Sequence, residues 1–413
     1  MWTKFRDGDW ITGERLKVYP LMLLAASALA IFAMIWLTND RLGPDNKPLG
    51  TDFSQVWVAG RSVLAGHPEA PFDLDRHIAE QHREFGAQSA VYGWHYPPYF
   101  LAVAAPLARL PYLQALLVWQ LSTLALYLAA VAAILRDARP GLGRVFIAAL
   151  AFPAVLVNLG HGQNGFLTAA LLGGGFLLLD RRPALAGALL ALLAYKPQFA
   201  LVLPAALIAG RQWRALGAAA VALALMTLAS VAAFGLDAWR AFLESLSLTR
   251  SLVVEQGATG FEKIQSVFAA VRLMGGSVST AYAAQSVATV GAIGALIWLW
   301  RSRADFRIKA AAAVTATLVA TPYCLDYDMM ALAPAMAFVV AAGRQCGFLD
   351  YEKSLLALVF FAPLLARPVA TFAPAPLGAA MISLLFLALL RHGRPAPEPQ
   401  AAAGCDRLAA PAN

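Results

Sequence analysis

Long apolar runs alternate with short polar segments along almost the whole chain. The first run covers about residues 19 to 37. About 20 apolar residues, rising 1.5 Å each in an α-helix, suffice to cross the hydrocarbon core of a bilayer. Similar or shorter runs follow at about 97–135, 145–159, 165–179, 184–194, 197–210, 212–234, 280–301, 308–320 and 329–343, with two more before residue 392. The pattern predicts an all-α polytopic membrane protein with about 12 transmembrane helices.

Arg and Lys residues recur at every second connection between these runs, beginning with Lys4, Arg6, Arg15 and Lys17. Because cytoplasmic connections carry an excess of Lys and Arg, both termini are predicted to be cytoplasmic. Residues 1–18 then form a cytoplasmic segment, 19–392 the transmembrane domain and 393–413 a disordered cytoplasmic tail rich in Pro and Ala. Two large outer loops result, at 38–96 and 235–279.

The run at 97–135 is interrupted by Pro106, Arg109 and Pro111, so it is consistent with one spanning unit or two. Arg136, Arg139 and Arg144 follow it and belong in the cytoplasm. A single net crossing is therefore predicted, with a first half that only dips into the membrane.

The composition excludes a soluble protein and a nucleic-acid-binding protein. With 60% hydrophobic and 14% charged residues, too little polar surface exists to cover a soluble core. The net charge of +8 arises from arginines placed between apolar runs, where membrane orientation requires them. The spacing of the cysteines does not match a zinc site.

Most candidate polar residues fall on the outer face in this topology. They are Asp52, His95, Tyr96, His161, Gln163, Asn164, Gln265, Arg272, Asp326 and Asp328. Their convergence indicates an active site that faces the periplasm. A transporter would instead line a path across the membrane with polar residues, and many transporters contain internal repeats, of which this chain shows none.

Several of these residues have a structural alternative. Asp52 begins an amphipathic stretch expected to lie along the membrane interface, and its carboxylate is either a helix cap or a general base. The segment 94–98 is either an aromatic anchor or part of a site. The glycines of 160–165 permit a tight hairpin, while Gln163 and Asn164 offer donors and acceptors suited to sugar hydroxyls.

Lys196 interrupts an apolar stretch and should lie inside the bilayer profile or at a cavity. Its ammonium is expected either to pair with an aspartate or to bind a lipid phosphate. Arg272 precedes a Gly-Gly pair and is the second candidate for an anionic headgroup. Asp326 and Asp328 lie two residues apart, so at most one is expected to point into the site.

Many short motifs occur in an order that resembles glycosyltransferase family 87, a family of bacterial membrane enzymes with the GT-C fold. They are Thr51-Asp52-Phe53, Tyr96-Pro97-Pro98, Leu110-Pro111, Gly162-Gln163-Asn164, Lys196-Pro197, Gln265-Ser266 and the segment from Pro322 to Asp328. The resemblance extends over about residues 19 to 390. Family members often have histidine in the turn that matches 326–328, whereas this chain has Tyr327 and Asp328. A role of that histidine does not transfer.

The resemblance implies transfer of a hexose, most often mannose, from a polyprenyl-phosphate donor to a lipid or glycan acceptor at the outer side of the bacterial cytoplasmic membrane. Asp52 would be the general base of an inverting reaction, and Lys196 or Arg272 would bind the donor phosphate. The residues expected to contact sugar or acceptor are His95, Tyr96, His161, Gln163, Asn164, Gln265, Asp326, Tyr327 and Asp328, with Trp57 and Trp94 stacking on sugar or prenyl groups.

Neither a metal nor a cofactor is expected, because a lipid monophosphate leaving group needs little metal assistance. Besides its substrates, the expected partners are membrane lipids. The alternatives that share this composition are a transporter of lipid-linked sugars and a polymerase or ligase of surface polysaccharide.

Overall fold

The computed structural model describes residues 2–43, 45–138 and 141–394. Throughout these ranges the regular secondary structure is helical, with only isolated bridges such as Ile264–Leu325. The all-α prediction is confirmed. Of the predicted tail at 393–413, only residues 393 and 394 are described. Arg139, which is predicted to be cytoplasmic, lies outside the described residues.

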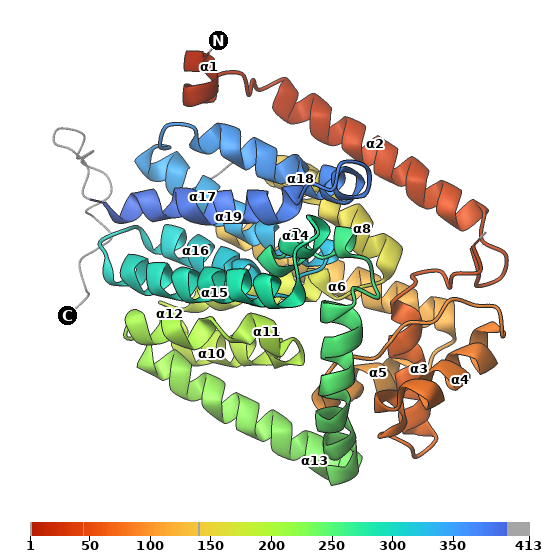
Figure 1. Cartoon of the computed structure of the whole chain (residues 1–413). Coiled ribbons are helices and arrows are strands. Elements are labelled where there is room, and N and C mark those ends of the chain that lie inside the picture. The colour runs from red at the N-terminus through yellow and green to blue at the C-terminus, as the bar shows by residue number, and fades with distance from the viewer. Residues whose placement is uncertain (1, 44, 139–140, 395–413) are drawn as a thin grey trace.

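The helices follow one another closely along the chain (Figure 1). In order they are α1 (Trp2–Asp7), α2 (Arg15–Trp36), α3 (Phe53–Leu64), α4 (Leu74–Phe85), α5 (Leu101–Leu107), α6 (Tyr112–Leu135), α7 (Leu142–Ala151), α8 (Pro153–His161), α9 (Gly165–Leu178), α10 (Pro183–Ala191), α11 (Pro197–Ala200), α12 (Leu203–Ala209), α13 (Trp213–Thr249), α14 (Val267–Leu273), α15 (Val278–Arg301), α16 (Phe306–Val319), α17 (Leu332–Cys346), α18 (Glu352–Phe372) and α19 (Leu377–Leu390). The 3₁₀ helices are η1 (Ala70–Phe72), η2 (Pro98–Phe100), η3 (Arg136–Ala138), η4 (Leu192–Tyr195), η6 (Phe261–Lys263), η7 (Asp326–Ala331) and η8 (Arg391–Gly393), and η5 (Arg250–Glu255) is a π-helix.

Within the described ranges, six helices are long and apolar enough to cross a membrane, or seven if the bent pair α7 and α8 forms one span. Several other apolar helices are shorter, such as α9 with 14 residues and α10 with 9. The chain is thus a polytopic membrane protein, but the predicted count of about 12 spans is not confirmed. Between residues 97 and 135 the structure has one long helix, α6, preceded by the short α5.

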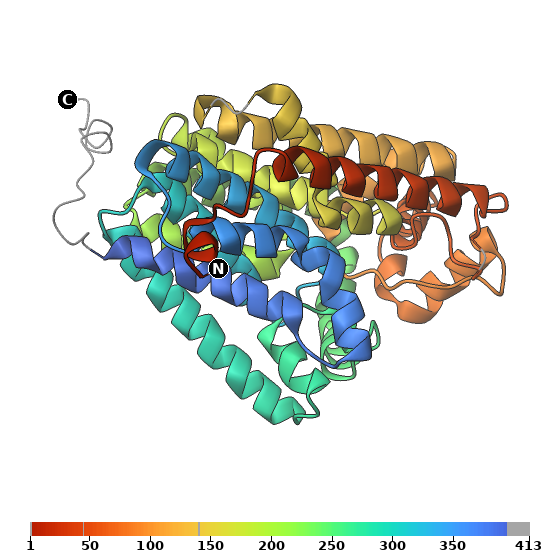
Figure 2. The same cartoon turned by 90° about the horizontal axis from the view of Figure 1, so that it is seen from above.

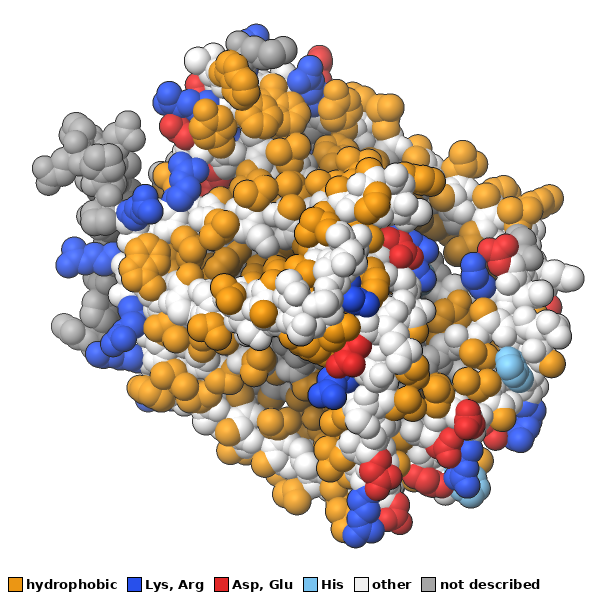
Figure 3. Space-filling view, in the orientation of Figure 1, with side chains coloured by type: hydrophobic (Ala, Val, Ile, Leu, Met, Phe, Trp, Pro, Cys, Tyr) orange, Lys and Arg blue, Asp and Glu red, His pale blue; other side chains and the backbone are white. Residues whose placement is uncertain are grey.

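Charge and hydrophobicity divide the molecule along its length. Lys and Arg side chains gather at the end near the C-terminus, and a belt of hydrophobic side chains separates them from the mixed charges at the opposite end (Figure 3). The basic end is where α9, α12, α15 and α17 finish and where α10, α13, α16 and α18 begin. The helix ends near residues 161, 195 and 325 therefore meet at the other end of the bundle.

The segment 38–96 forms a lobe at that opposite end (Figures 1 and 2). Its helix α3 packs on α5 so closely that a Cβ atom at Gly60 would overlap the carbonyl oxygen of Ala104. Phe53 and Val58 are fully buried. Protein therefore covers this helix on nearly every side, which its amphipathic pattern did not predict, and its placement along the membrane interface stays a prediction.

Two other local predictions are corrected. The helix predicted at 145–159 breaks at Phe152, where α7 and α8 meet at 58°. The residue before a proline disfavours the helical conformation, and Pro153 follows Phe152, which is extended. The predicted loop at 235–279 is largely helical: α13 changes direction at Gly235, where φ is 79°, and continues to Thr249 before η5, η6 and α14.

A close approach of α10 to α13 yields a test of the packing. A Cβ atom at Gly187 would overlap the carbonyl oxygen of Ala215, whereas one at Gly217 would meet nothing within 4 Å. Gly187→Ala should lower the free energy of unfolding by about 1–3 kcal/mol, since neighbouring backbone cannot easily yield. Thermal denaturation in detergent measures this. Gly217→Ala is the control and should be neutral or slightly stabilising, and equal melting temperatures for the two variants would contradict the packing.

Candidate active site

A small pocket, with a cavity volume of about 80 Å³, lies where the lobe meets the non-basic ends of the bundle helices. The lining residues are Asp52, Gln55, Tyr92, Gly93, His95, Tyr96, Gln163, Tyr195, Lys196, Gln198, Thr259, Tyr323, Leu325 and Tyr327. Among these described residues, one carboxylate and one ammonium accompany neutral polar and aromatic groups.

Asp52 occupies the N-cap position of α3, yet its side chain makes no capping hydrogen bond. Its carboxylate instead accepts a hydrogen bond of 2.9 Å from Nε2 of Gln163. The capping role that the sequence left open is therefore not the one adopted. Oδ1 of Asp52 makes no hydrogen bond within the described chain and is available to a ligand.

The turn at 160–165 reaches Asp52 because of a single glycine. Gly162 ends α8 in the left-handed conformation, with φ of 61°, which glycine adopts at little cost. A Cβ atom there would lie 2.6 Å from the Cβ of Phe53 and 2.8 Å from the carbonyl oxygen of Gly50. Only glycine allows the turn to approach the start of α3 so closely, and this approach places Gln163 beside Asp52.

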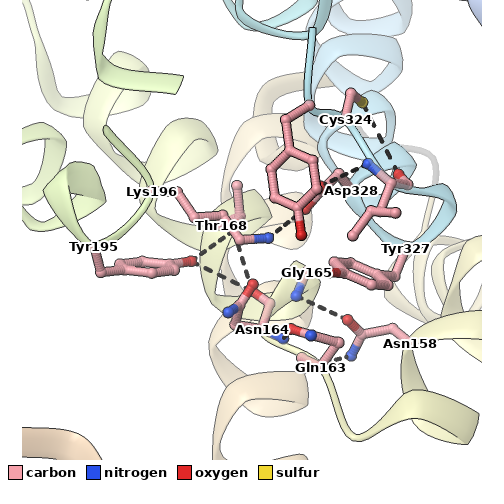
Figure 4. A network of polar contacts seen from close by, with 12 residues as sticks. Asn158, Gln163, Asn164, Gly165, Thr168, Tyr195, Lys196, Cys324, Tyr327 and Asp328 are labelled. Carbon is pink, nitrogen blue, oxygen red and sulfur yellow. Dashed lines mark hydrogen bonds and ion pairs between the residues drawn. The ribbon is translucent and has the colours of Figure 1, made fainter. Parts of the chain in front are cut away.

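A chain of hydrogen bonds continues from Gln163 into the bundle. Oε1 of Gln163 accepts from the Tyr96 hydroxyl at 3.0 Å, and Nδ2 of Asn164 donates to the same hydroxyl at 2.8 Å. Asn158 bridges the turn, donating to the Gln163 carbonyl and accepting from the Gly165 amide (Figure 4). Gln163 therefore ties two parts of the lobe, the start of α3 and the segment before η2, to the hairpin between α8 and α9.

Lys196 lies in the break between η4 and α11, where its side chain is only 4% exposed. Its ammonium forms a 2.5 Å ion pair with Asp328, which also accepts a hydrogen bond from the Leu325 amide (Figure 4). The centroid of the Tyr327 ring lies 4.9 Å from the same nitrogen. Of the two alternatives for Lys196, the structure contains the aspartate pair. An ammonium has three donors, however, and Lys196 still faces the pocket.

Burial sets the ionisation of two further groups in the pocket wall. It lowers the pKa of His95 to about 4, so the imidazole is neutral near pH 7, and Nδ1 lies 3.1 Å from the Thr249 hydroxyl. Burial and the nearby charge of Asp52 raise the pKa of Tyr92 to about 12. Both side chains are thus uncharged hydrogen-bonding groups.

Several residues predicted for the site lie outside the pocket wall. Arg272 donates to the carbonyls of Gly276 and Glu255, so its guanidinium closes a local turn. Trp57 donates to the Leu110 carbonyl and packs in the lobe, where Trp94 is also buried. The remaining residues of this kind are Asn164, which donates to Tyr96, His161, bonded to Thr51, Gln265, bonded to the Glu262 carbonyl, Asp326, 3.9 Å from Arg367, and Asp328, paired with Lys196.

The two aspartates of η7 point in different directions, as their spacing predicts. Asp328 faces Lys196, while Asp326 faces Arg367 and the Tyr327 amide. Neither lines the pocket. No group of three or more His, Cys, Asp or Glu side chains that could hold a metal ion occurs among residues 2–43, 45–138 and 141–394.

The pocket also contains residues that sequence reasoning missed, namely Gln55, Tyr92, Tyr195, Gln198, Thr259 and Tyr323. For two of them, the spacing in the sequence could have predicted a place in the site. Gln55 follows Asp52 by three residues and shares its helix face, and Gln198 follows the Lys196 break by two. Thr259 lies in a segment whose fold had no periodic pattern, so nothing in the sequence placed it at the site.

A family model for glycosyltransferase family 87 matches residues 94–322, which is more than half of the chain. The chain belongs to glycosyltransferase family 87. This family 87 member is accordingly a membrane glycosyltransferase. The matched span includes Tyr96, Gln163 and Lys196 and begins after Asp52. No curated protein and no solved structure matches the chain significantly.

The fully buried Asn158 gives a test of how the site is held. Asn158→Leu removes both bonds to the turn and leaves the Gln163 carbonyl and the Gly165 amide without their partner. Each unpaired buried group costs about 1–3 kcal/mol, so the melting temperature should fall substantially. Gln88→Leu, which replaces an exposed amide of the lobe, is the control and should have little effect on the melting temperature. An Asn158→Leu variant as stable as wild type would exclude Asn158 as the support of the turn.

Proposed function

We propose that this family 87 member transfers a hexose, with mannose as the expected sugar, from a polyprenyl-phosphate donor to a lipid or glycan acceptor at the periplasmic side of the bacterial cytoplasmic membrane. The observation that carries the proposal is the shared pocket of Asp52 and Lys196. One side chain can take a proton and the other can face a phosphate, as group transfer from a lipid phosphate requires.

In the proposed reaction the acceptor hydroxyl attacks the anomeric carbon of the donor sugar with inversion. Its proton passes to the Asp52 carboxylate as the new C–O bond forms. The bond from the anomeric carbon to the phosphate oxygen breaks, and its electron pair leaves with the polyprenyl phosphate. Lys196 stabilises the charge that grows on that phosphate. Gln163 orients the base through its hydrogen bond to Oδ2.

The distribution of charge supports a periplasmic site. Arg and Lys residues occupy the connections at the end opposite the pocket, including Arg181, Arg211, Arg303 and Arg344. Under the positive-inside rule this basic end is cytoplasmic. The pocket is then at the outer end, where a donor anchored by its lipid tail would present its sugar.

Asp52→Asn should reduce sugar transfer by at least about a hundredfold, because general-base catalysis contributes roughly 10²–10⁴-fold. Asparagine keeps an oxygen that can accept from Gln163, so the fold should persist. The assay follows radiolabelled mannose from polyprenyl-phosphate mannose into lipids and glycans of membranes from a deletion strain that expresses each variant. Asp45→Asn, at an exposed aspartate of the same lobe, is the control. Near-wild-type transfer by the Asp52 variant would remove Asp52 as the base.

The roles of Lys196 and Asp328 can be distinguished by how their substitutions change the KM for the donor. Lys196→Met should raise the KM for polyprenyl-phosphate mannose, and should also destabilise the protein because Asp328 is left as a buried unpaired charge. Asp328→Asn keeps the ammonium and should retain donor binding. Equal donor KM values for wild type and a folded Lys196→Met protein, measured at saturating acceptor, would limit the pair to a structural role.

A further inference from the structure

The polar side chains of the pocket differ in how much of their hydrogen-bonding capacity is already used. Gln163 has both its amide nitrogen and its amide oxygen engaged, with Asp52 and Tyr96. Gln55 lines the same pocket and is only 5% exposed, yet its amide oxygen has no hydrogen-bond partner in the described chain. The hydroxyl of Thr259, also in the pocket wall, is likewise unpaired there.

A buried amide oxygen without a partner is unfavourable, and folded proteins rarely retain one unless something else pairs with it. The helix that carries Gln55 is fixed in place. Gln55 lies in the first turn of α3, between the fully buried Phe53 and Val58, and α3 packs tightly against α5 through Gly60. The packing therefore sets where the side chain of Gln55 enters the pocket wall, as the support of a binding group must.

The position of Gln55 on α3 identifies which substrate it would meet. Residues three apart on a helix share a face, so Gln55 projects beside Asp52. Lys196 approaches from a different element, at the η4–α11 break. The group next to Gln55 is accordingly the one whose hydroxyl Asp52 deprotonates, and the donor phosphate lies with Lys196.

We propose that Gln55, assisted by Thr259, binds hydroxyl groups of the acceptor adjacent to the attacking one and so positions that acceptor against Asp52. A carboxamide both donates and accepts, which matches a hydroxyl. This inference rests on the proposed function. It assigns hydroxyl binding to Gln55 and Thr259 rather than to Gln163, whose amide is engaged by Asp52 and Tyr96, or to Asn164, which lies outside the pocket wall.

The test compares stability with substrate affinity in Gln55→Leu. Leucine has a similar shape and no unpaired oxygen, so the melting temperature should stay the same or rise. The apparent KM for the acceptor should rise about tenfold, the effect expected from losing one or two hydrogen bonds, while the donor KM is unchanged. The donor is polyprenyl-phosphate [¹⁴C]mannose, and the acceptor is the total lipid extract of a deletion strain.

A second buried glutamine provides the matched control. Gln285 is 4% exposed and well paired, accepting from the Phe268 amide and donating to the Val319 carbonyl, and it lies outside the pocket wall. Gln285→Leu should lower the melting temperature and leave the acceptor KM unchanged. The opposite responses of these two variants separate a binding glutamine from a structural one.

Thr259→Val tests the second group independently of Gln55. An unchanged acceptor KM in the folded variants would overturn the inference, as would a fall in melting temperature like that of Gln285→Leu. Asp52→Asn is measured alongside. If it abolishes transfer while Gln55→Leu and Thr259→Val behave as wild type, the proposed function stands and only the acceptor assignment fails. Normal transfer by Asp52→Asn would reject the proposed function itself.

Discussion

The hydrogen bond between Gln163 and Asp52 is the contact on which the site depends. It joins the lobe formed by 38–96 to the hairpin of α8 and α9, and the two residues are 111 positions apart in sequence. The bond exists because Gly162 lets the hairpin turn touch Gly50 and Phe53. Replacing Gly162 by a residue with a Cβ atom would therefore move the Gln163 amide away from the Asp52 carboxylate, although neither of these two residues would be changed.

The pocket contains two kinds of polar group: those that hydrogen-bond to other protein groups and those that have no protein partner in the described chain. Groups that connect elements, such as Gln163 and Tyr96, are bonded to each other and define the shape of the site. Groups without protein partners in the described chain, such as the Gln55 amide oxygen, remain for a substrate. The Lys196–Asp328 pair belongs to both kinds, since one donor of the ammonium fixes η7 while the ion still faces the pocket.

Predictions from the sequence succeeded where a residue type at a given position has few possible structural roles. The apolar runs and the arginines between them predicted the helical class, and isolated ionisable residues such as Asp52 and Lys196 led to the pocket. Predictions failed where the outcome depended on packing. Nothing local distinguishes an interfacial helix from a covered one, so the burial of α3 was missed, and Arg272 looked available although nearby carbonyls bind it.

The short helices that made the span count uncertain are also what create the site. α9, η4 and α11 each begin or end at the end of the bundle where the lobe lies, and residues at or beside these ends line the pocket. Free backbone groups and a buried ammonium are tolerated at such ends only where protein or a cavity surrounds them. The break before α11 provides such a position, because Lys196 is 4% exposed there, pairs with Asp328 and still lines the pocket with Asp52.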